Sequence, residues 1–244
     1  MKHVTIMGIP FIHIDQQGFV SLLQGHIEQK KKTFVITANP EVVIKANEDA
    51  AFMEYIKQAT YITADGIGIV KGAQILNNPL PGRVTGYDTM MQLLDIANKE
   101  NYKIFLLGAQ RETLDKTIEK ISINYPGVNI VGSHDGYFNW EDNDIADRVA
   151  ELKPDITFVA LGVPKQEKWI AENLHKFNYG VFMGIGGSFD VIAGTVKRAP
   201  VFWQKLNLEW FYRLLKQPSR WRRMIALPRF AIQIIKQRMK GPSS

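Results

Sequence analysis

Six short apolar runs, rich in β-branched and aromatic residues, recur along the first three quarters of the chain. Each run has the length of a buried strand and is bounded by polar or turn-forming residues. The pattern predicts strands over residues 33–38, 59–63, 102–107, 128–131, 155–161 and 179–183.

Longer amphipathic stretches separate these runs. They predict helices over residues 16–30, 40–57, 66–76, 87–99, 111–124, 144–152 and 165–176. Buried strands that alternate with helices are typical of a parallel sheet with both faces covered. We therefore expect an α/β fold that is Rossmann-like, with a mostly parallel sheet and helices on both faces.

A polar or glycine-rich turn follows every predicted strand, and in this class of fold ligands bind beyond the carboxyl ends of the strands. Any single turn is explained by backbone geometry, because Gly and Asn favour tight turns. Six such turns at one edge favour a nucleotide site. The turns cover residues 39–41, 65–66, 108–109, 132–137, 162–167 and 184–188.

The charge is divided unevenly between two parts of the chain. The 244 residues carry a net charge of +6, but residues 195–244 contain twelve basic residues and a single acid, Glu209, for a net +11. Residues 1–194 are left with −5. We therefore expect an α/β catalytic domain over 1–194 and a C-terminal basic helical appendage over 195–244 that attaches to something anionic.

Composition excludes several classes of protein. Apolar residues make up 45% of the chain, so it is not a disordered chain, and the absence of Cys excludes disulfide scaffolds, thiol nucleophiles and iron–sulfur clusters. No apolar stretch approaches the roughly 18 residues of a spanning helix, and the N-terminal residues make a poor signal peptide. We expect a cytoplasmic protein.

The sequence motifs argue against a bound cofactor. Neither the dinucleotide fingerprint nor a Walker motif is present, and the five His residues lack metal-ligand spacing. Asp142-Asn143-Asp144 has the Asp-x-Asp form that holds a metal-bound nucleotide sugar in many glycosyltransferases. Since it directly precedes a predicted helix, we interpret it as helix capping. We expect no cofactor and no required metal.

Asp65 is the acid with the strongest catalytic pattern. It follows an apolar strand and precedes Gly66-Ile67-Gly68, so its carboxylate can accept a proton from an attacking hydroxyl; an N-cap is the structural alternative. Thr37 and Asn39 end the preceding strand and can orient a sugar or phosphate. Arg83 lies in a loop rich in Pro and Gly, and Arg binds phosphate bidentately, although it can also be a plain surface residue.

Seven short motifs resemble those of the WecG/TagA/CpsF glycosyltransferase family, in the same order and over about residues 2–225. They are Thr37-Ala-Asn-Pro-Glu41, Thr63-Ala-Asp-Gly66, Arg83-x-x-Gly-x-Asp88, Leu107-Gly-Ala109, Gly162-x-Pro-x-Gln-Glu167, Gly184-x-Gly-Gly-x-Phe-Asp190 and Arg198-Ala-Pro200. The chain looks closest to the N-acetylmannosaminyltransferases that begin wall teichoic acid linkage units.

The resemblance implies transfer of N-acetylmannosamine from UDP to the C4 hydroxyl of N-acetylglucosamine on undecaprenyl pyrophosphate. The linkage is β-1,4 and forms with inversion. Asp65 matches the family's proposed base, and Thr37, Asn39 and Arg83 complete the catalytic set that we expect. The substrate-binding residues expected from the match are Gly108, Asp135, Gly136, Tyr137, Gly162, Pro164, Gln166, Glu167, Gly186, Arg213, Arg220 and Arg223.

The basic tail interleaves aromatic residues with Arg and Lys, in patterns of amphipathic helices broken near Pro218 and Pro228. Three interpretations compete: a nucleic-acid surface, aromatics that pack on the body, and an interfacial membrane anchor. No nucleic-acid motif is present, and a lipid-linked acceptor favours the anchor. We expect a protein peripheral on the inner face of the membrane, whose tail arginines also reach the pyrophosphate.

Two alternatives remain at the level of sequence. A sibling enzyme would transfer N-acetylmannosaminuronic acid or glucose from UDP, and a nucleotide-sugar-binding protein would catalyse no transfer. The expected partners are a UDP-sugar donor, the polyprenyl-linked acceptor and an anionic membrane surface, without nucleic acid. A homo-oligomer stays open.

Overall fold

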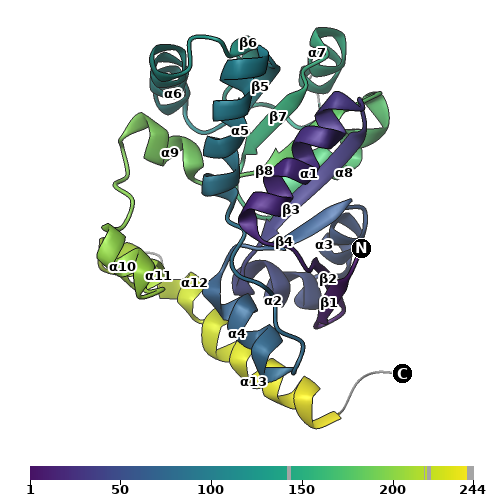
Figure 1. Ribbon diagram of the computed structural model, residues 1–244, viewed down its shortest axis with the longest axis vertical. Coiled ribbons are helices and arrows are strands. Elements are labelled where there is room, and N and C mark those ends of the chain that lie inside the picture. Colours follow the sequence, from purple (N-terminus) through teal and green to yellow (C-terminus); the bar gives the residue numbers. More distant parts are fainter. Residues whose placement is uncertain (142–143, 217, 219–220, 241–244) are drawn as a thin grey trace.

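The computed structural model describes residues 1–141, 144–216, 218 and 221–240. Within these residues six strands form one parallel sheet in the order β4-β3-β8-β7-β5-β6, which confirms the predicted α/β fold (Figure 1). The strands are β3 (Lys32–Ala38), β4 (Tyr61–Ala64), β5 (Lys103–Gly108), β6 (Asn129–His134), β7 (Ile156–Ala160) and β8 (Gly180–Gly184). Each one overlaps a predicted strand.

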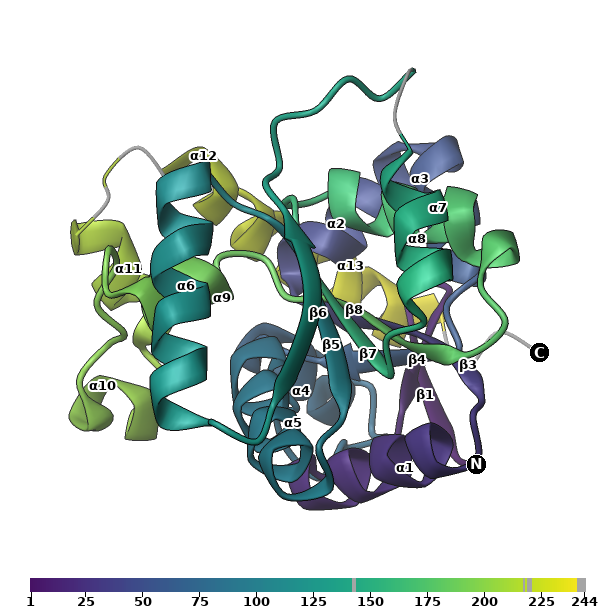
Figure 2. The same ribbon diagram turned by 90° about the horizontal axis from the view of Figure 1, so that it is seen from above.

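Helices connect the strands and cover both faces of the sheet (Figure 2). The helices of the body are α1 (Gln16–Glu28), α2 (Pro40–Glu48), α3 (Ala50–Lys57), α4 (Ile67–Ile75), α5 (Gly86–Glu100), α6 (Arg111–Asn124), α7 (Ile145–Leu152), α8 (Lys165–Asn173), the short 3-10 helix η1 (Leu174–Lys176) and α9 (Ser188–Ala193). Helix α9 was not predicted from the sequence.

Two hydrophobic cores lie on the opposite faces of the sheet. One contains Phe34 and Phe182 of the sheet beneath α2, α3, α4, α7 and α8, and the other contains Val35 and Met183 beneath α1, α5, α6 and α9. Neighbouring residues of one strand thus serve different cores, because successive side chains point to opposite faces. The helices that follow β5 and β7 lie on opposite faces of the sheet. The loop after β5 and the loop after β7 therefore run in different directions, although the two strands are neighbours.

The predicted helix over 40–57 is two helices. Asp49 adopts an extended conformation, ends α2 and accepts a hydrogen bond from the Phe52 amide at 3.0 Å, so it caps α3. An Asp side chain that can satisfy a free amide favours such a restart over continuation. The sequence pattern missed the break because apolar residues continue on both sides of it.

An antiparallel hairpin, β1 (His3–Ile6) with β2 (Ile9–Ile12), was also not predicted. Its turn consists of Met7 and Gly8, both with positive φ, which matches the right-handed twist of a two-residue hairpin. Val4, Phe11 and their neighbours are buried against the edge of the larger sheet beside β4. The strands are too short for a clear alternating pattern in the sequence.

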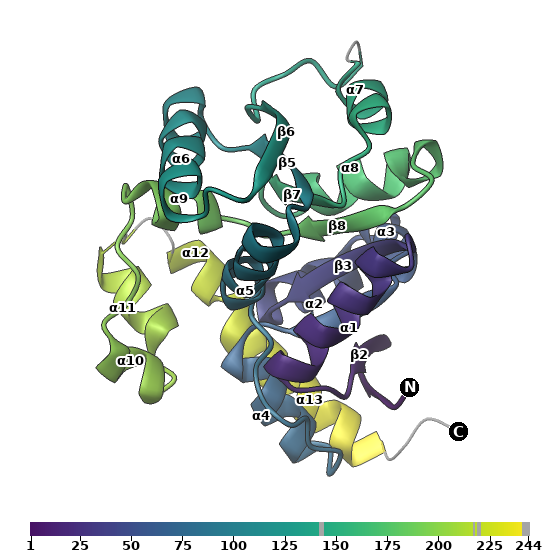
Figure 3. The same cartoon turned by 45° about the horizontal axis from the view of Figure 1, so that its top comes forward.

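The C-terminal part of the described chain forms the helices α10 (Val201–Lys205), α11 (Glu209–Lys216), α12 (Trp221–Met224) and α13 (Ala226–Lys240). Figures 1 and 3 show α10 and α11 away from the sheet, whereas α13 lies along α4. The predicted break near Pro228 is found between α12 and α13, at Ile225, and Pro228 itself lies in the first turn of α13, where a helix does not need the N–H that proline lacks. The division of the chain at residue 194 stays a prediction.

Helix α13 shares a core with the body. Phe230 is 3% exposed and Ile234 is fully buried. Both side chains pack against α4 at Gly72, where they fill the space that a Cβ would occupy. The Gln237 side chain accepts a hydrogen bond from the Met7 amide at 2.9 Å, which ties α13 to the hairpin. Part of the basic segment is therefore bound to residues 1–194 through apolar contacts.

Candidate active site

The carboxyl ends of the parallel strands place the predicted turns along one edge of the sheet, here called the carboxyl edge and formed by residues 39–41, 65–66, 108–109, 135–137, 161–167 and 185–188. The loops contact one another there. The Asp65 amide donates to the Ala38 carbonyl at 3.0 Å, and the Gly136 amide donates to the Ala109 carbonyl at 2.8 Å. Segments far apart in the sequence are thereby joined at one site.

Thr37, Gln166, Glu167 and Gly186 make hydrogen bonds that meet at the 184–187 loop of this edge. Thr37 Oγ1 donates to the Gly184 carbonyl at 3.2 Å. The Gly186 amide donates to Gln166 Oε1 at 3.1 Å, and Gln166 Nε2 donates to Glu167 Oε1 at 2.8 Å. Four residues predicted separately from the sequence thus join the ends of β3 and β8 to the first turn of α8.

Glu167 is the acid of this group of residues. It is 2% exposed, and its Oε2 has no hydrogen-bond partner among the described residues. Burial raises the pKa of Glu167 to about 7, although the hydrogen bond from Gln166 acts in the opposite direction. The nearby Glu41 carboxylate adds to the rise. The Glu167 carboxyl therefore holds a proton over a much wider pH range than an exposed glutamate.

Asp65 follows β4 and precedes α4, but it does not cap that helix. The cap residue is Gly66, which has no side chain, so the N-cap interpretation of Asp65 is wrong. Asn39 does act as a cap, because its Oδ1 accepts from the Val42 amide at 3.1 Å. This oxygen of Asn39 is therefore used in capping α2, a role that was not predicted for it, while the Asp65 carboxylate stays a candidate base.

The loops after β5, β6 and β7 form the other half of the edge. Gly108 has a φ of +120°, and a Cβ there would lie 2.4 Å from the Ala160 carbonyl, so backbone packing alone demands glycine. Asp135 Oδ1 accepts from the Tyr137 amide at 2.9 Å, and the Tyr137 side chain is 74% exposed. Gly162 and Pro164 lie in the turn that leads into α8, after the strand next to β5.

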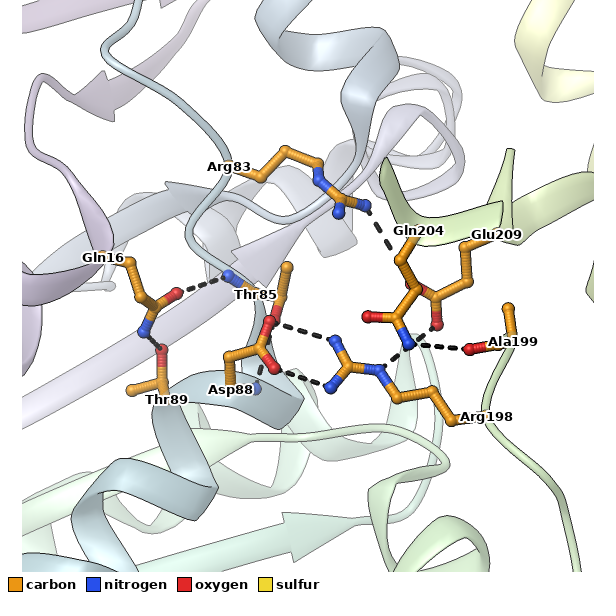
Figure 4. Close-up of polar contacts among 9 residues, drawn as sticks. All are labelled: Gln16, Arg83, Thr85, Asp88, Thr89, Arg198, Ala199, Gln204 and Glu209. Carbon is orange, nitrogen blue, oxygen red and sulfur yellow. Dashed lines mark hydrogen bonds and ion pairs between the residues drawn. The ribbon is translucent and has the colours of Figure 1, made fainter. Parts of the chain in front are cut away.

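Arg83 belongs to a charged cluster that joins the body to the C-terminal helices (Figure 4). Arg198 holds Asp88 bidentately, with Nη1 2.8 Å from Oδ1 and Nη2 3.1 Å from Oδ2. Glu209 lies between the two arginines, 4.0 Å from Arg83 Nη1 and 3.9 Å from Arg198 Nε. The single acid of the basic tail is thus only 14% exposed and faces two cations.

Asp88 is the anion on which this cluster is built. Its burial opposes ionisation, but hydrogen bonds from Arg198 and Thr85 outweigh that effect and keep the pKa of Asp88 below its usual value. Thr85 also caps α5 through the Asp88 amide, and Gln16 of α1 accepts from the Thr85 amide at 3.1 Å. Arg198 is therefore held by an element of the body.

Sequence reasoning assigned no role to Asp88, Arg198 or Glu209. Signals were present, because Asp88 and Arg198 lie in the quoted motifs and Glu209 is the single acid of a strongly basic segment. Pairing them required the tertiary structure, since Asp88 and Arg198 are 110 positions apart.

Several predicted residues cannot be placed. Arg220 lies outside the described residues, as do Asp142 and Asn143, and the side chains of Arg213 and Arg223 are not described. Asp144 occupies the N-cap position of α7 without a side-chain hydrogen bond to it. In the part of the chain that the structure describes, no three His, Asp or Glu side chains cluster closely enough to hold a metal ion.

Comparison with known proteins gives a match to the Glycosyl transferase WecG/TagA/CpsF family over residues 4–244. A protein of Bacillus subtilis (strain 168) is 41% identical over 97% of this chain and 93% of its own length. Relatives from Bacillus spizizenii (strain ATCC 23059 / NRRL B-14472 / W23) and Staphylococcus aureus (strain MW2) are 39% and 38% identical, again over 97% of this chain and over 92% and 94% of their own. All three are named N-acetylglucosaminyldiphosphoundecaprenol N-acetyl-beta-D-mannosaminyltransferase. The resemblance seen in the motifs is confirmed, and the chain belongs to the WecG/TagA/CpsF family of glycosyl transferases.

Proposed function

We propose that this enzyme transfers N-acetylmannosamine to N-acetylglucosaminyldiphosphoundecaprenol, an early step of wall teichoic acid linkage-unit synthesis. The observation that carries the proposal is 38–41% identity over 97% of the chain to three proteins whose names state this transfer. The match is close to full length on both sides, since more than nine tenths of each relative is covered as well.

The donor in this proposal is UDP-N-acetylmannosamine, and the transfer inverts the anomeric centre. The Asp65 carboxylate takes the proton from the acceptor C4 hydroxyl as that oxygen forms its bond to C1 of the donor. The bond from C1 to the diphosphate oxygen breaks at the same time, and UDP leaves with the electron pair. Support comes from the position of Asp65 at the carboxyl edge, beside the end of β3 and directly before the N-cap residue of α4.

The leaving diphosphate gains negative charge during this step, and the carboxyl edge offers positive groups to meet it. The N-termini of α2, α4, α6 and α8 all follow strands at this edge, and each carries a partial positive charge. Arg83 is near the same edge, 22% exposed, in the loop that enters α5. We assign Arg83 and the tail residues Arg213, Arg220 and Arg223 to the diphosphate, with no metal required.

The C-terminal helices are proposed to bind the cytoplasmic face of the membrane, where the acceptor lipid is found. Most of the large apolar residues that the described chain exposes belong to residues 201–239, with Phe202 at 68% and Leu206 at 50%. The same segment holds most of the tail's basic residues. Exposed apolar groups beside cations are suited to an anionic interface. No described helix is long and apolar enough to cross a membrane.

The proposal is tested with purified full-length protein, a short-chain lipid-diphosphate-N-acetylglucosamine acceptor and a panel of UDP sugars. We expect acceptor-dependent release of UDP with UDP-N-acetylmannosamine, and a β-linked disaccharide by NMR. Release with the uronic acid or glucose donor instead would identify a sibling activity. Binding of every donor without release would reduce the protein to a nucleotide-sugar-binding role.

A further inference from the structure

The Gln166 side chain bridges two elements of the carboxyl edge. Only one orientation of its side-chain amide satisfies both of its hydrogen bonds. Its Oε1 accepts from the Gly186 amide, and its Nε2 donates to Glu167 Oε1. A side-chain amide carries donors on one side and an acceptor on the other. Turning it over would place two oxygens together at Glu167 and two N–H groups together at Gly186. The acceptor at Glu167 therefore selects the orientation that holds Gly186.

The backbone around Gly186 depends on this bridge. A Cβ at Gly184 would lie 2.6 Å from Gln166 Nε2, so the amide fills the space against the end of β8. Gly184 also accepts the hydrogen bond from Thr37. The loop of residues 184–187 is thus held on one side by Thr37 and on the other by Gln166, and Glu167 fixes Gln166.

Glu167 is suited to this role by its burial. It is 2% exposed, and the described residues provide no partner for Oε2. An ionised carboxylate with one oxygen buried and unpaired is costly, so the neutral acid is favoured in this place. Two described polar side chains from α8 and α3 are engaged elsewhere: Lys168 lies over the Trp140 ring, and the Tyr55 hydroxyl donates to Glu172. Glu41 of α2 adds a negative charge nearby.

We propose that Glu167 is a positioning residue, which orients the Gln166 amide and thereby holds the 184–187 loop in the geometry needed for sugar transfer. The inference rests on the proposed function for its effect on turnover, but not for its effect on the loop. The role needs an acceptor at Oε1 and a neutral group of carboxylic acid size. Glutamine meets both needs, whereas leucine supplies neither the acceptor nor any polar contact.

The test compares Glu167→Gln and Glu167→Leu, with Glu172→Leu on the same helix as a control exposed to solvent. Two quantities are measured: amide hydrogen exchange at Gly186 by NMR, and kcat and KM for the donor. In Glu167→Leu we expect exchange at Gly186 to accelerate at least tenfold and kcat to fall roughly 10²-fold, because small displacements at a reacting site are costly, with KM changed far less. Glu167→Gln should keep both values within about threefold of the wild type.

The proposal is overturned if Glu167→Leu folds with Gly186 still protected and kcat unchanged, or if Glu167→Gln loses as much as Glu167→Leu. Should the leucine variant fail to fold, Glu167→Met, which is unbranched and similar in length, takes its place with the same two criteria. Wild-type protein that transfers no sugar would refute the proposed function alone. Exchange at Gly186 would still decide whether Glu167 holds the loop.

Discussion

Asp65 illustrates how a single residue changes meaning once its neighbours are known. By sequence it was equally suited to be a base or a helix cap, and in the structure Gly66 occupies the cap position. Its amide donates a hydrogen bond to the Ala38 carbonyl at the end of β3, so Asp65 lies beside the segment that holds Thr37 and Asn39. The role of Asp65 as the base stays a prediction, which the following variant tests.

The Asp65→Asn variant should fold as the wild type does and lose transfer by roughly 10²–10⁴-fold, because the amide cannot accept the proton. UDP release in the presence of acceptor measures the loss, and thermal unfolding checks the fold. Asp115→Asn, which alters an exposed carboxylate on α6, serves as the matched control and should retain full activity. Near-normal turnover in the Asp65 variant would remove this residue as the base.

Glu167 should also leave a signature in the pH dependence of stability. Burial raises its pKa to about 7 from an ordinary value of 4.5. Between these values the folded state binds more protons than the unfolded state, so the stability conferred by Glu167 is complete below pH 4.5 and is lost as the pH rises through 7. Glutamine has no proton to lose and should not show this decline.

Denaturant unfolding at pH 5 and pH 8 measures this effect. The free energy of unfolding of the wild type should fall relative to Glu167→Gln by on the order of 3 kcal/mol across that interval. The Glu172→Gln variant, altered at a half-exposed position of the same helix, controls for general changes with pH. A constant difference between wild type and Glu167→Gln would mean that the buried carboxyl does not titrate in this range.

Among the elements, the loop before α5 and the segment after α9 are fastened by the Asp88–Arg198 pair. Arg198 also stacks over Tyr87, 4.6 Å from the ring centre, and approaches Glu209 at the start of α11. The side chains of Arg198 and Asp88 are 24% and 33% exposed, so water screens this pair only partly. The contact therefore positions the chain that leads from α9 into the C-terminal helices.

Replacing Arg198 by Ala should lower the free energy of unfolding by on the order of 1–3 kcal/mol, since it removes the bidentate partner of a half-buried carboxylate. Arg111→Ala is the matched control. Arg111 also pairs with an Asp, Asp115, at 3.0 Å, but 71% of its side chain is exposed, and such pairs contribute about 0–1 kcal/mol. Equal effects of the two substitutions on thermal unfolding would contradict the fastening role.

Helix α13 offers a second test at the scale of elements. Phe230 is buried against α4, whereas Ile232, two positions on, is 54% exposed. Phe230→Ala should cost roughly 3 kcal/mol through lost burial and the cavity that remains. Ile232→Ala should cost far less. If hydrogen exchange in α13 is equally protected in both variants and the wild type, the helix is held by something other than this contact.

At the scale of the whole molecule, apolar exposure is concentrated in the C-terminal helices. Phe202, Leu206 and Leu215 are each at least half exposed, in the segment that also carries most of the tail's positive charge. Deleting residues 195–244 would remove α13 as well and uncover the apolar surface of the body around Gly72. Point substitutions are therefore the sharper test of membrane binding.

The triple variant Phe202→Ser, Leu206→Ser and Leu215→Ser should lose most of its co-sedimentation with vesicles that contain phosphatidylglycerol, because the apolar contribution of each inserted side chain is lost. Binding by the wild type should also weaken with salt. Ile123→Ser, on α6 and 69% exposed, is the control and should bind as the wild type does. Unchanged sedimentation of the triple variant would refute the anchor.

Sequence patterns alone were enough to predict the layers of this protein and the sheet edge at which its polar turns lie. Strand and helix periods are local, so the parallel sheet and its polar turns followed from neighbouring residues alone, and ordered motifs were enough to indicate the family. The helix break at Asp49 and the two short strands of the hairpin were not predicted, because a few residues cannot establish a hydrophobic period.

The contacts between side chains, by contrast, are seen only in the folded chain. The Gln166–Gly186 bond spans 20 positions, Thr37–Gly184 spans 147 and Asp88–Arg198 spans 110, and no local pattern records such pairings. Burial is likewise a property of the folded whole, which is why the raised pKa of Glu167 was invisible in its residue type. The physical reason is common to both: hydrogen bonding and desolvation depend on what surrounds a group in space, and chain order fixes that only through the fold.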